Sequence, residues 1–191
     1  MRRMGTVIQL QVQGERLKDH RPDSYDPRRI TQVDALELTP DGAFGLWETG
    51  ERLQDVHHNH HPTSRSRGDN TLSICFTQQY ERAREQFGTA LPFGCMGENI
   101  LIEGSTAFQP GLPGPTLVFS TDGSTDKVIV SLNRPAPPCR PFSAFASGAS
   151  TPNELKLALQ FFSDGGRGYY AQLKEPQSVM LHPGLEVYLL D

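Results

Sequence analysis

One cysteine of this sequence lies in a stretch that is both rigid and basic, "NRPAPPCRPFSAF", residues 133–145. Prolines on both sides of Cys139 fix backbone φ angles and remove amide donors, so we predict a stiff extended connection rather than an inner sheet strand. Arg134 and Arg140 would favour the ionised thiol of Cys139, and the thiolate is the form that attacks electrophiles and binds metals. The alternative interpretation is a buried structural thiol.

The three cysteines of the sequence include no Cys-x-x-Cys pair, which argues against both a disulfide framework and a thiolate zinc site. Cys75 lies inside the apolar stretch "TLSICF" and is predicted to be a buried structural thiol. Cys95 lies in the stretch "FGCMGENILIEG", residues 93–104, where an exposed position is open to it. Cys139 is therefore the first candidate for chemistry.

The stretch at residues 93–104 is the second candidate site. Gly94 and Gly97 let the backbone bend sharply or approach a ligand closely. The amides beside Glu98 and Asn99 could cradle an anion, and Asn99 offers both a donor and an acceptor. A simple hairpin turn that feeds the strand "NILIEG" explains the same residues equally well.

The third candidate is the histidine loop, "DVHHNHH", which holds most of the six histidines of the chain. Asp55 is followed by His57, His58, His60 and His61. Neutral imidazoles are common ligands of zinc, copper and nickel. Neighbouring residues of one loop rarely complete a tetrahedral site, so a solvated or substrate-facing loop is favoured over a metal site.

The composition limits the classes of function. A chain of 191 residues is predicted to form a single domain over residues 1–191. Its net charge of -4 lacks the basic footprint of nucleic-acid binding, although Arg65 and Arg67 could receive one small anion. No apolar run is as long as a membrane span, and the chain does not begin like a signal peptide, so we expect a cytoplasmic protein without membrane or nucleic-acid partners.

Short strands dominate the predicted secondary structure. "GTVIQLQVQ" has the near period-two pattern of a half-buried strand, and "RITQVDALELTPDGAFGLWETG" predicts a hairpin that turns at residues 40–42. Residues 57–70 predict an exposed loop. Further strands are predicted in "TLSICF", "ENILIEG", "PTLVFS", "KVIVSL" and the C-terminal segment. So many short strands with frequent turns indicate a barrel or a sandwich.

Two helices are predicted between these strands. "TQQYERAREQFG" has Thr77 as a possible N-cap and Gly88 as a left-handed stop. "TPNELKLALQFFSDGGRG" follows a cap position at Asn153 and precedes Gly165. A strand is the alternative for this second segment, because its leucines also alternate with period two.

The order of these motifs resembles the MOSC domain, named for the C-terminal domain of molybdenum cofactor sulfurase, and its small stand-alone members in particular. A polar "DVH" loop comes first, then a strand and a helix, "GENILIEG", "RPAPPC" and a late "GRGYYAQLKEPQSV". The resemblance extends from "GTVIQLQVQ" to the terminal "GLEVYLLD". It matches Asp55 and His57 to the Asp-x-His opening of the family, residues 97–99 to its Gly-Glu-Asn turn, and Cys139 to its characteristic cysteine.

The resemblance implies a mostly β, barrel-like fold with a few short helices and a pocket around the cysteine. Family members are thought to bind the molybdenum cofactor or to carry sulfur on the cysteine, some relatives reduce N-hydroxylated compounds, and pyridoxal phosphate binding is also associated with the family. This chain departs from the family where it has "HHNHHPTSRSRG", because many members have His-Gly-Gly or His-Ala-Gly there. The arginine that usually follows this loop is either Arg65 or Arg67.

Three hypotheses follow from the residues and the resemblance. In the first, the chain is the molybdenum-cofactor-carrying component of a reductase, and an electron-transfer protein supplies the electrons that no site of its own can supply. In the second, it is a sulfur carrier that forms a persulfide on Cys139 with sulfur from a cysteine desulfurase. In the third, it binds an anion or a metal without catalysis.

All three hypotheses draw on one set of candidate residues. In the first, Cys139 ligates molybdenum, and the turn amides and an arginine of the 65–67 loop hold the pterin phosphate. Cys139 is the catalytic or metal-binding thiol in the first two. The residues expected to bind the cofactor are Asp55, His57, Arg65, Arg67, Gly97, Glu98, Asn99, Arg134 and Arg140.

Overall fold

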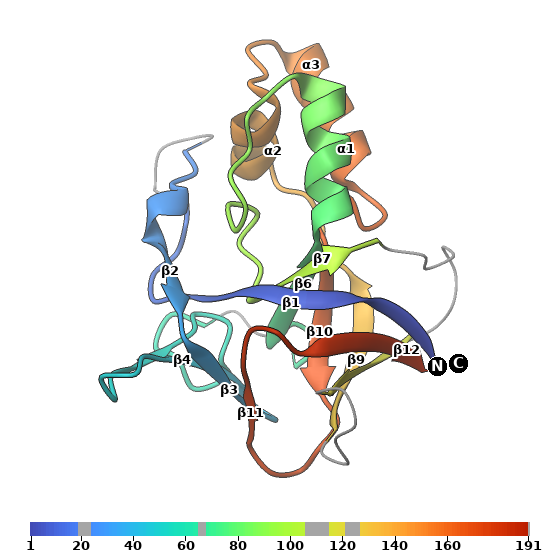
Figure 1. The fold of residues 1–191 in the computed structure, drawn as a ribbon. Helices are drawn as coiled ribbons and strands as arrows, with labels where there is room; N and C mark the ends of the chain where they lie inside the picture. Colours follow the sequence, from blue (N-terminus) through green and yellow to red (C-terminus); the bar gives the residue numbers. More distant parts are fainter. Residues whose placement is uncertain (19–23, 65–67, 106–114, 121–126, 191) are drawn as a thin grey trace.

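The computed structural model describes residues 1–18, 24–64, 68–105, 115–120 and 127–190 of the chain. The fold is mostly β, with strands that close into a barrel and helices gathered at one end of it (Figure 1). This confirms the predicted barrel-like class. The N- and C-terminal strands lie side by side, because Arg2 pairs with Leu189 and Thr6 with Glu186.

The barrel closes because the first strand of the sequence pairs with the last one. Around the barrel, the strands are β12 (Glu186–Leu190), β8 (Thr116–Ser120), β9 (Val128–Pro135), β10 (Tyr169–Leu173), β6 (Leu72–Phe76), β7 (Ile100–Gly104) and β1 (Arg2–Gln13). All pairs are antiparallel except β6 with β7. Closure leaves no open edge in this ring, which avoids unpaired backbone groups.

The barrel interior is an apolar core to which the described barrel strands contribute. Val7, Leu10 and Val12 of β1 are buried there, as the alternating pattern of this strand predicts. From Leu10 onward, β1 pairs with β2 (Ile30–Val33), which lies outside the closed ring of strands. The segment that follows β1 therefore begins at the barrel rim, where it becomes part of the site.

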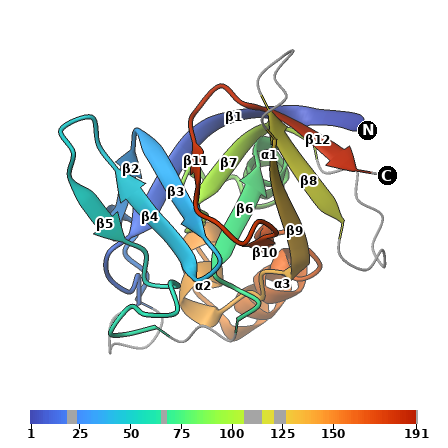
Figure 2. The same cartoon turned by 90° about the horizontal axis from the view of Figure 1, so that it is seen from below.

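A second sheet lies to one side of the barrel (Figure 2). Its strands are β11 (Val179–Leu181), β3 (Ala35–Thr39), β4 (Gly42–Leu46) and β5 (Arg52–Gln54). The β3–β4 pair confirms the predicted hairpin. Gly42 in its turn has φ +138°, and a Cβ there would lie 2.6 Å from Cα of His58, so this glycine lets the histidine loop pack on the hairpin.

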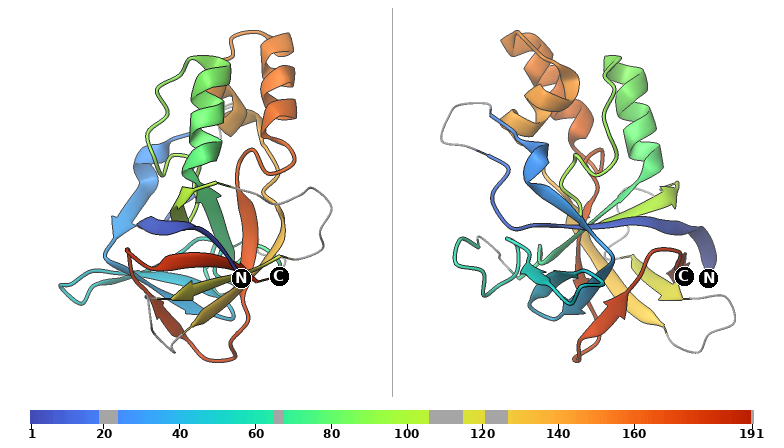
Figure 3. Two further views of the ribbon diagram at one scale, coloured as in Figure 1. Left: turned by 45° about the vertical axis from the view of Figure 1, so that its right-hand side comes forward. Right: turned by 60° about the vertical axis from the view of Figure 1, so that its left-hand side comes forward.

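The helices α1 (Thr77–Phe87), α2 (Arg140–Ser147) and α3 (Pro152–Phe162) stand together above one end of the barrel (Figure 3). A second apolar cluster fills the space beneath them, with Tyr80, Phe142 and Phe162 fully buried. None of the described helices has the length and apolar character needed to cross a membrane.

Both predicted helices are confirmed, although their first residues differ from the prediction. α1 ends at left-handed Gly88 as predicted, but Thr77 is its first residue rather than its cap, because its Oγ1 accepts a hydrogen bond from Gly104 N instead. α3 is capped by Thr151 rather than Asn153, through a reciprocal capping box with Glu154.

The prediction for the proline-rich stretch is only partly right. Its first residues end β9, and α2, which the sequence reading missed, begins directly after Cys139. Pro141 does not prevent this helix, because a proline in the first helical turn lacks an amide that would have no partner there anyway. Cys139 is thus the N-cap residue of a helix and not the middle of an extended connection.

Candidate functional site

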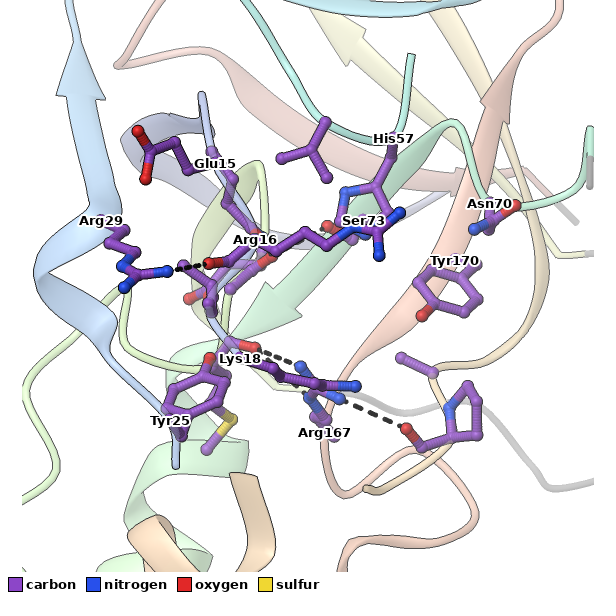
Figure 4. A pocket seen from close by; sticks show the side chains of 18 of the residues that line it. Glu15, Arg16, Lys18, Tyr25, Arg29, His57, Asn70, Ser73, Arg167 and Tyr170 are labelled. Carbon is purple, nitrogen blue, oxygen red and sulfur yellow. Dashed lines mark hydrogen bonds between the residues drawn. The ribbon is translucent and has the colours of Figure 1, made fainter. Parts of the chain in front are cut away.

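The sequence motifs meet around one pocket of about 1050 Å³. Its walls come from the end of β1 and the segment after it, the histidine loop, the turn before β7, and the facing ends of β9 and β10. Figure 4 shows His57, Tyr170 and Arg167 reaching into this space from different segments.

Asp55 is a fully buried carboxylate directly behind His57. Its Oδ1 accepts hydrogen bonds from the backbone N and the ring Nδ1 of His57, both at 2.9 Å. Its Oδ2 accepts from the backbone N of Gln13 at 2.8 Å and from Nδ2 of Asn99 at 2.9 Å. Burial opposes ionisation, but the hydrogen bonds, led by that from His57, hold the pKa of Asp55 below its ordinary value. The ionised Asp55 fixes the His57 ring through Nδ1, which leaves Nε2 for the pocket.

Asn99 joins the two predicted motifs into one hydrogen-bonded unit. While Nδ2 donates to Asp55, Oδ1 accepts from the backbone N and the Oγ of Ser73, each at 3.0 Å. Asn99 is 1% exposed, so it acts on the pocket through these neighbours. The Asp-x-His loop, β6 and the Gly-Glu-Asn turn are therefore held in fixed relative positions.

Gly97 is the residue that allows the turn to pack so closely on β1. Its φ is +85°, and a Cβ there would lie 3.0 Å from Nε2 of Gln13, which donates to the Gly97 carbonyl at 2.6 Å. The amide of Gly97 donates to Gly94 O at 3.1 Å, and that of Asn99 donates to Ser73 O at 2.9 Å. Because both amides are engaged inside the protein, the expected amide cradle for an anion is largely occupied.

Glu98 is the second buried carboxylate of this wall, with 3% of its surface exposed. Its Oε1 accepts a hydrogen bond from the hydroxyl of Tyr80 at 2.7 Å. Its Oε2 is buried and has no hydrogen-bond partner among the described residues. Burial raises the pKa of Glu98 to about 7, even though the Tyr80 hydrogen bond and the charge of Arg167 oppose the shift.

Basic side chains outnumber acidic ones along the described pocket wall. The basic residues are Arg16, Lys18, Arg29, Arg134 and Arg167, and the acidic ones are Glu15, Asp69 and Glu98. Arg134 pairs with Asp69 at 2.6 Å, whereas no ion pair joins Arg16, Lys18 or Arg167 to a described carboxylate. A chain of net charge -4 thus concentrates positive charge at this pocket.

Arg167 connects the pocket to Cys139. Its Nη1 lies 3.7 Å from Cys139 Sγ and 3.4 Å from the carbonyl oxygen of Pro137. Its Nε and Nη2 donate to Met96 O at 3.3 Å and 3.2 Å, and its guanidinium lies over the Phe142 ring at 4.4 Å. Cys139 is half-buried and does not itself line the described pocket wall. The guanidinium that contacts the thiol is thus that of Arg167, whereas Arg134 binds Asp69.

The remaining predicted residues are placed as follows. Arg140 is exposed beside Cys139 and outside the pocket wall, and Arg65 and Arg67 lie outside the described residues. Cys75 and Cys95 are both buried, so the exposed position left open for Cys95 is excluded.

The histidine loop divides between the pocket and the body of the protein. His57 and His61 line the pocket, His58 is buried, and exposed His60 faces Asp41 with Nε2 at 3.4 Å from Oδ2. The prediction of an exposed loop over residues 57–70 is therefore only partly right, because His58 and Asn70 are buried. Within the described ranges, no cluster of three or more His, Cys, Asp or Glu side chains could hold a metal ion.

The sequence reading missed most of the basic wall. Arg16, Lys18 and Arg29 belong to a stretch that carries no motif, although the five lysines and arginines within residues 16–29 were a signal of anion binding. Arg167 lies in the late "GRG" segment that contributed to the family resemblance, but no role followed from it.

The fold and site together define a β-barrel domain with a basic pocket. Residues 54–188 match the MOSC domain, so the chain belongs to the MOSC domain family, which is associated with molybdenum cofactor binding. The comparison with curated proteins gives no match.

Solved structures show the same fold. The crystal structure of APC1665, the YUAD protein from Bacillus subtilis, is similar with a TM-score of 0.62 and 12% identity over 98% of this chain and 96% of that chain. YiiM from Geobacillus stearothermophilus is similar with a TM-score of 0.53 and 16% identity over 97% of this chain and 75% of that chain. At these identities, the likeness concerns the fold alone.

Proposed function

We propose that the pocket binds the molybdenum cofactor through its phosphate-bearing pterin. The observation that carries this proposal is the concentration of basic side chains on the pocket wall of a chain with net charge -4. Guanidinium groups bind phosphate oxygens with charge-assisted hydrogen bonds, and one guanidinium often donates two parallel hydrogen bonds to one phosphate. Membership of the MOSC domain family agrees with this ligand.

The donor set of the pocket fits such a ligand. Arg16, Lys18 and Arg167, which have no ion pair with a described carboxylate, would hold the phosphate. His57, oriented by Asp55, would offer Nε2 to the pterin or to a substrate. Lys18 is the one lysine on the described wall and is exposed, so a buried Schiff-base lysine, as pyridoxal phosphate enzymes use, has no counterpart on this wall.

Cys139 would provide the protein ligand to the metal. A soft sulfur ligand suits this role, and Nη1 of Arg167, which lines the pocket, lies 3.7 Å from Sγ. The bound metal would supply two-electron redox chemistry, as a reduction of N-hydroxylated compounds requires. The protein's own residues would then bind, orient and shield the reactants, with electrons from a separate electron-transfer protein.

The test is the molybdenum and pterin content of the purified chain after reconstitution with free cofactor. Wild type is expected to hold both near one per chain. Cys139→Ser is expected to keep pterin and lose most molybdenum, and Arg167→Gln to lose both. Arg140→Gln is the matched control, because Arg140 is exposed beside Cys139 outside the pocket wall.

Retention of neither component by wild type would contradict the proposal. The sulfur-carrier alternative would then be tested by incubation with a cysteine desulfurase and cysteine. A gain of about 32 Da, one sulfur atom, on Cys139 and not on buried Cys75 would support that alternative. Neither metal nor sulfur on Cys139 would leave a non-catalytic anion-binding domain.

A further inference from the structure

We propose that Glu98 takes up a proton when the pocket binds its anionic ligand, and that Glu98 thereby sets the pH range over which the anion is held. This inference rests on the proposed function, because it takes the ligand to be an anion. It assigns Glu98 a role as a proton-linked specificity residue rather than as a direct contact of the cofactor.

Burial with few hydrogen-bond donors favours the neutral form of Glu98. An ionised carboxylate accepts several hydrogen bonds, and a buried one that lacks them is costly. The one side-chain donor to Glu98 among the described residues is the Tyr80 hydroxyl, on Oε1, and its buried Oε2 has no hydrogen-bond partner among them. The backbone amides of Gly94 and Glu98 stabilise the ionised form further, but not enough to offset burial. Within the same residues, no arginine, lysine or histidine forms an ion pair with it.

The groups around Glu98 come from several elements. Tyr80 of α1, Cys75 of β6 and Cys95 of the turn before β7 all have raised pKa values, chiefly because of burial, so they are neutral near pH 7. The same holds for Tyr25, from the segment between β1 and β2. Arg167, from the segment before β10, contributes positive charge and thus opposes protonation of Glu98. The raised pKa of Glu98, about 7, is the balance of these effects.

Binding of an anion changes this balance in a predictable direction. A negative charge in the pocket offsets the field of Arg167 and repels an ionised Glu98, so the neutral carboxyl is favoured. By linkage, anion affinity must then fall as pH rises through the pKa of free Glu98. We expect sulfate to bind about fivefold or more tightly at pH 6 than at pH 8, within the usual range of coupling between two sites.

Sulfate is a suitable probe because its charge does not change over this pH range. Calorimetric affinities of the full chain are measured for wild type, Glu98→Gln and His57→Gln. Glu98→Gln, which imitates the neutral carboxyl, is expected to bind sulfate with little pH dependence. His57→Gln and His61→Gln, measured in the same way, control for the two histidines on this wall and are expected to keep most of the dependence.

A direct measurement needs no variant. The 13C chemical shift of the Glu98 carboxyl in wild type is followed against pH, with and without sulfate. A midpoint near 7 that rises when sulfate is added supports the inference.

Two outcomes overturn it separately from the proposed function. Sulfate binding with no shift in the Glu98 midpoint, or with a pH dependence that survives in Glu98→Gln, contradicts the role of Glu98 alone. If wild type binds neither sulfate nor cofactor at any pH tested, anion recognition itself is wrong, and the inference falls with it.

Discussion

Asp55 and Glu98 are two buried carboxylates beside the same pocket, and their environments drive their charges in opposite directions. Asp55 is 0% exposed and Glu98 is 3% exposed, so burial does not distinguish them. Asp55 accepts hydrogen bonds from Gln13, Asn99 and the backbone N and ring Nδ1 of His57, whereas the one side chain that donates to Glu98 among the described residues is Tyr80. The pKa is lowered for Asp55 and raised to about 7 for Glu98.

The difference shows that the number of donors, and not burial alone, decides which carboxylate stays ionised. Asp55, whose pKa is lowered, favours its ionised form, positions His57 and ties the histidine loop to Asn99. Glu98 can exchange a proton near neutral pH. Two carboxyl groups held in such different states can perform different tasks in one site.

The largest loss of stability is expected when the hydrogen-bond network around Asp55 is broken. Asp55→Asn replaces an acceptor by an amide that faces the donors of Gln13, His57 and Asn99. Because several buried donors lose their acceptor, the free energy of unfolding should fall by about 3–5 kcal/mol. Urea denaturation measures this change.

The matched control is Asp34→Asn. Asp34 is exposed and accepts one hydrogen bond, from Glu48 N at 2.8 Å, so its loss should cost less than about 1 kcal/mol. Equal losses in the two variants would show that the network around Asp55 contributes nothing beyond an ordinary surface contact.

The sequence predicts the parts of this comparison that depend on local pattern. Alternation in β1 and the left-handed stop of α1 at Gly88 reveal these elements, and the ordered motifs indicate that Asp55, His57 and residues 97–99 belong to one site. The Asp55–Asn99 contact at 2.9 Å gives these motifs a physical link.

The features of the site that the sequence does not predict depend on contacts between distant segments. Arg167 reaches Cys139 because β10 pairs with β9, with Tyr169 opposite Pro135, and no local pattern contains that register. The opposite pKa shifts of Asp55 and Glu98 are also invisible in the sequence, because they follow from which side chains donate to each carboxyl.

The free energy of unfolding should depend on pH through Glu98. The pKa of Glu98 is about 7 in the folded protein, against an ordinary value of 4.5, so the folded state binds more protons between these values. Stability from this group is therefore present below about pH 4.5 and is lost as pH rises to about 7, by about 3 kcal/mol in total. Glu98→Gln should remove this decline.

The measurement is the free energy of unfolding of wild type and variant at several pH values, where the difference isolates Glu98 from other groups. Glu103→Gln, at an exposed position of β7, is the control and should follow wild type. Parallel wild-type and Glu98→Gln curves would mean that Glu98 is ionised at neutral pH, like Asp55.

The smallest effect is expected from loss of the Tyr80 hydroxyl, the one side chain that donates to Glu98 among the described residues. Tyr80→Phe removes the hydroxyl that donates to Oε1 at 2.7 Å and that accepts from Met96 N at 3.1 Å. Unfolding free energy should fall by about 1–2 kcal/mol, and the Glu98 midpoint in the 13C titration should move further above wild type. Asp55 should be unaffected. A Glu98 midpoint that stays in place or falls would show that the Tyr80 hydrogen bond does not stabilise the ionised carboxylate, and that burial alone determines the charge of Glu98.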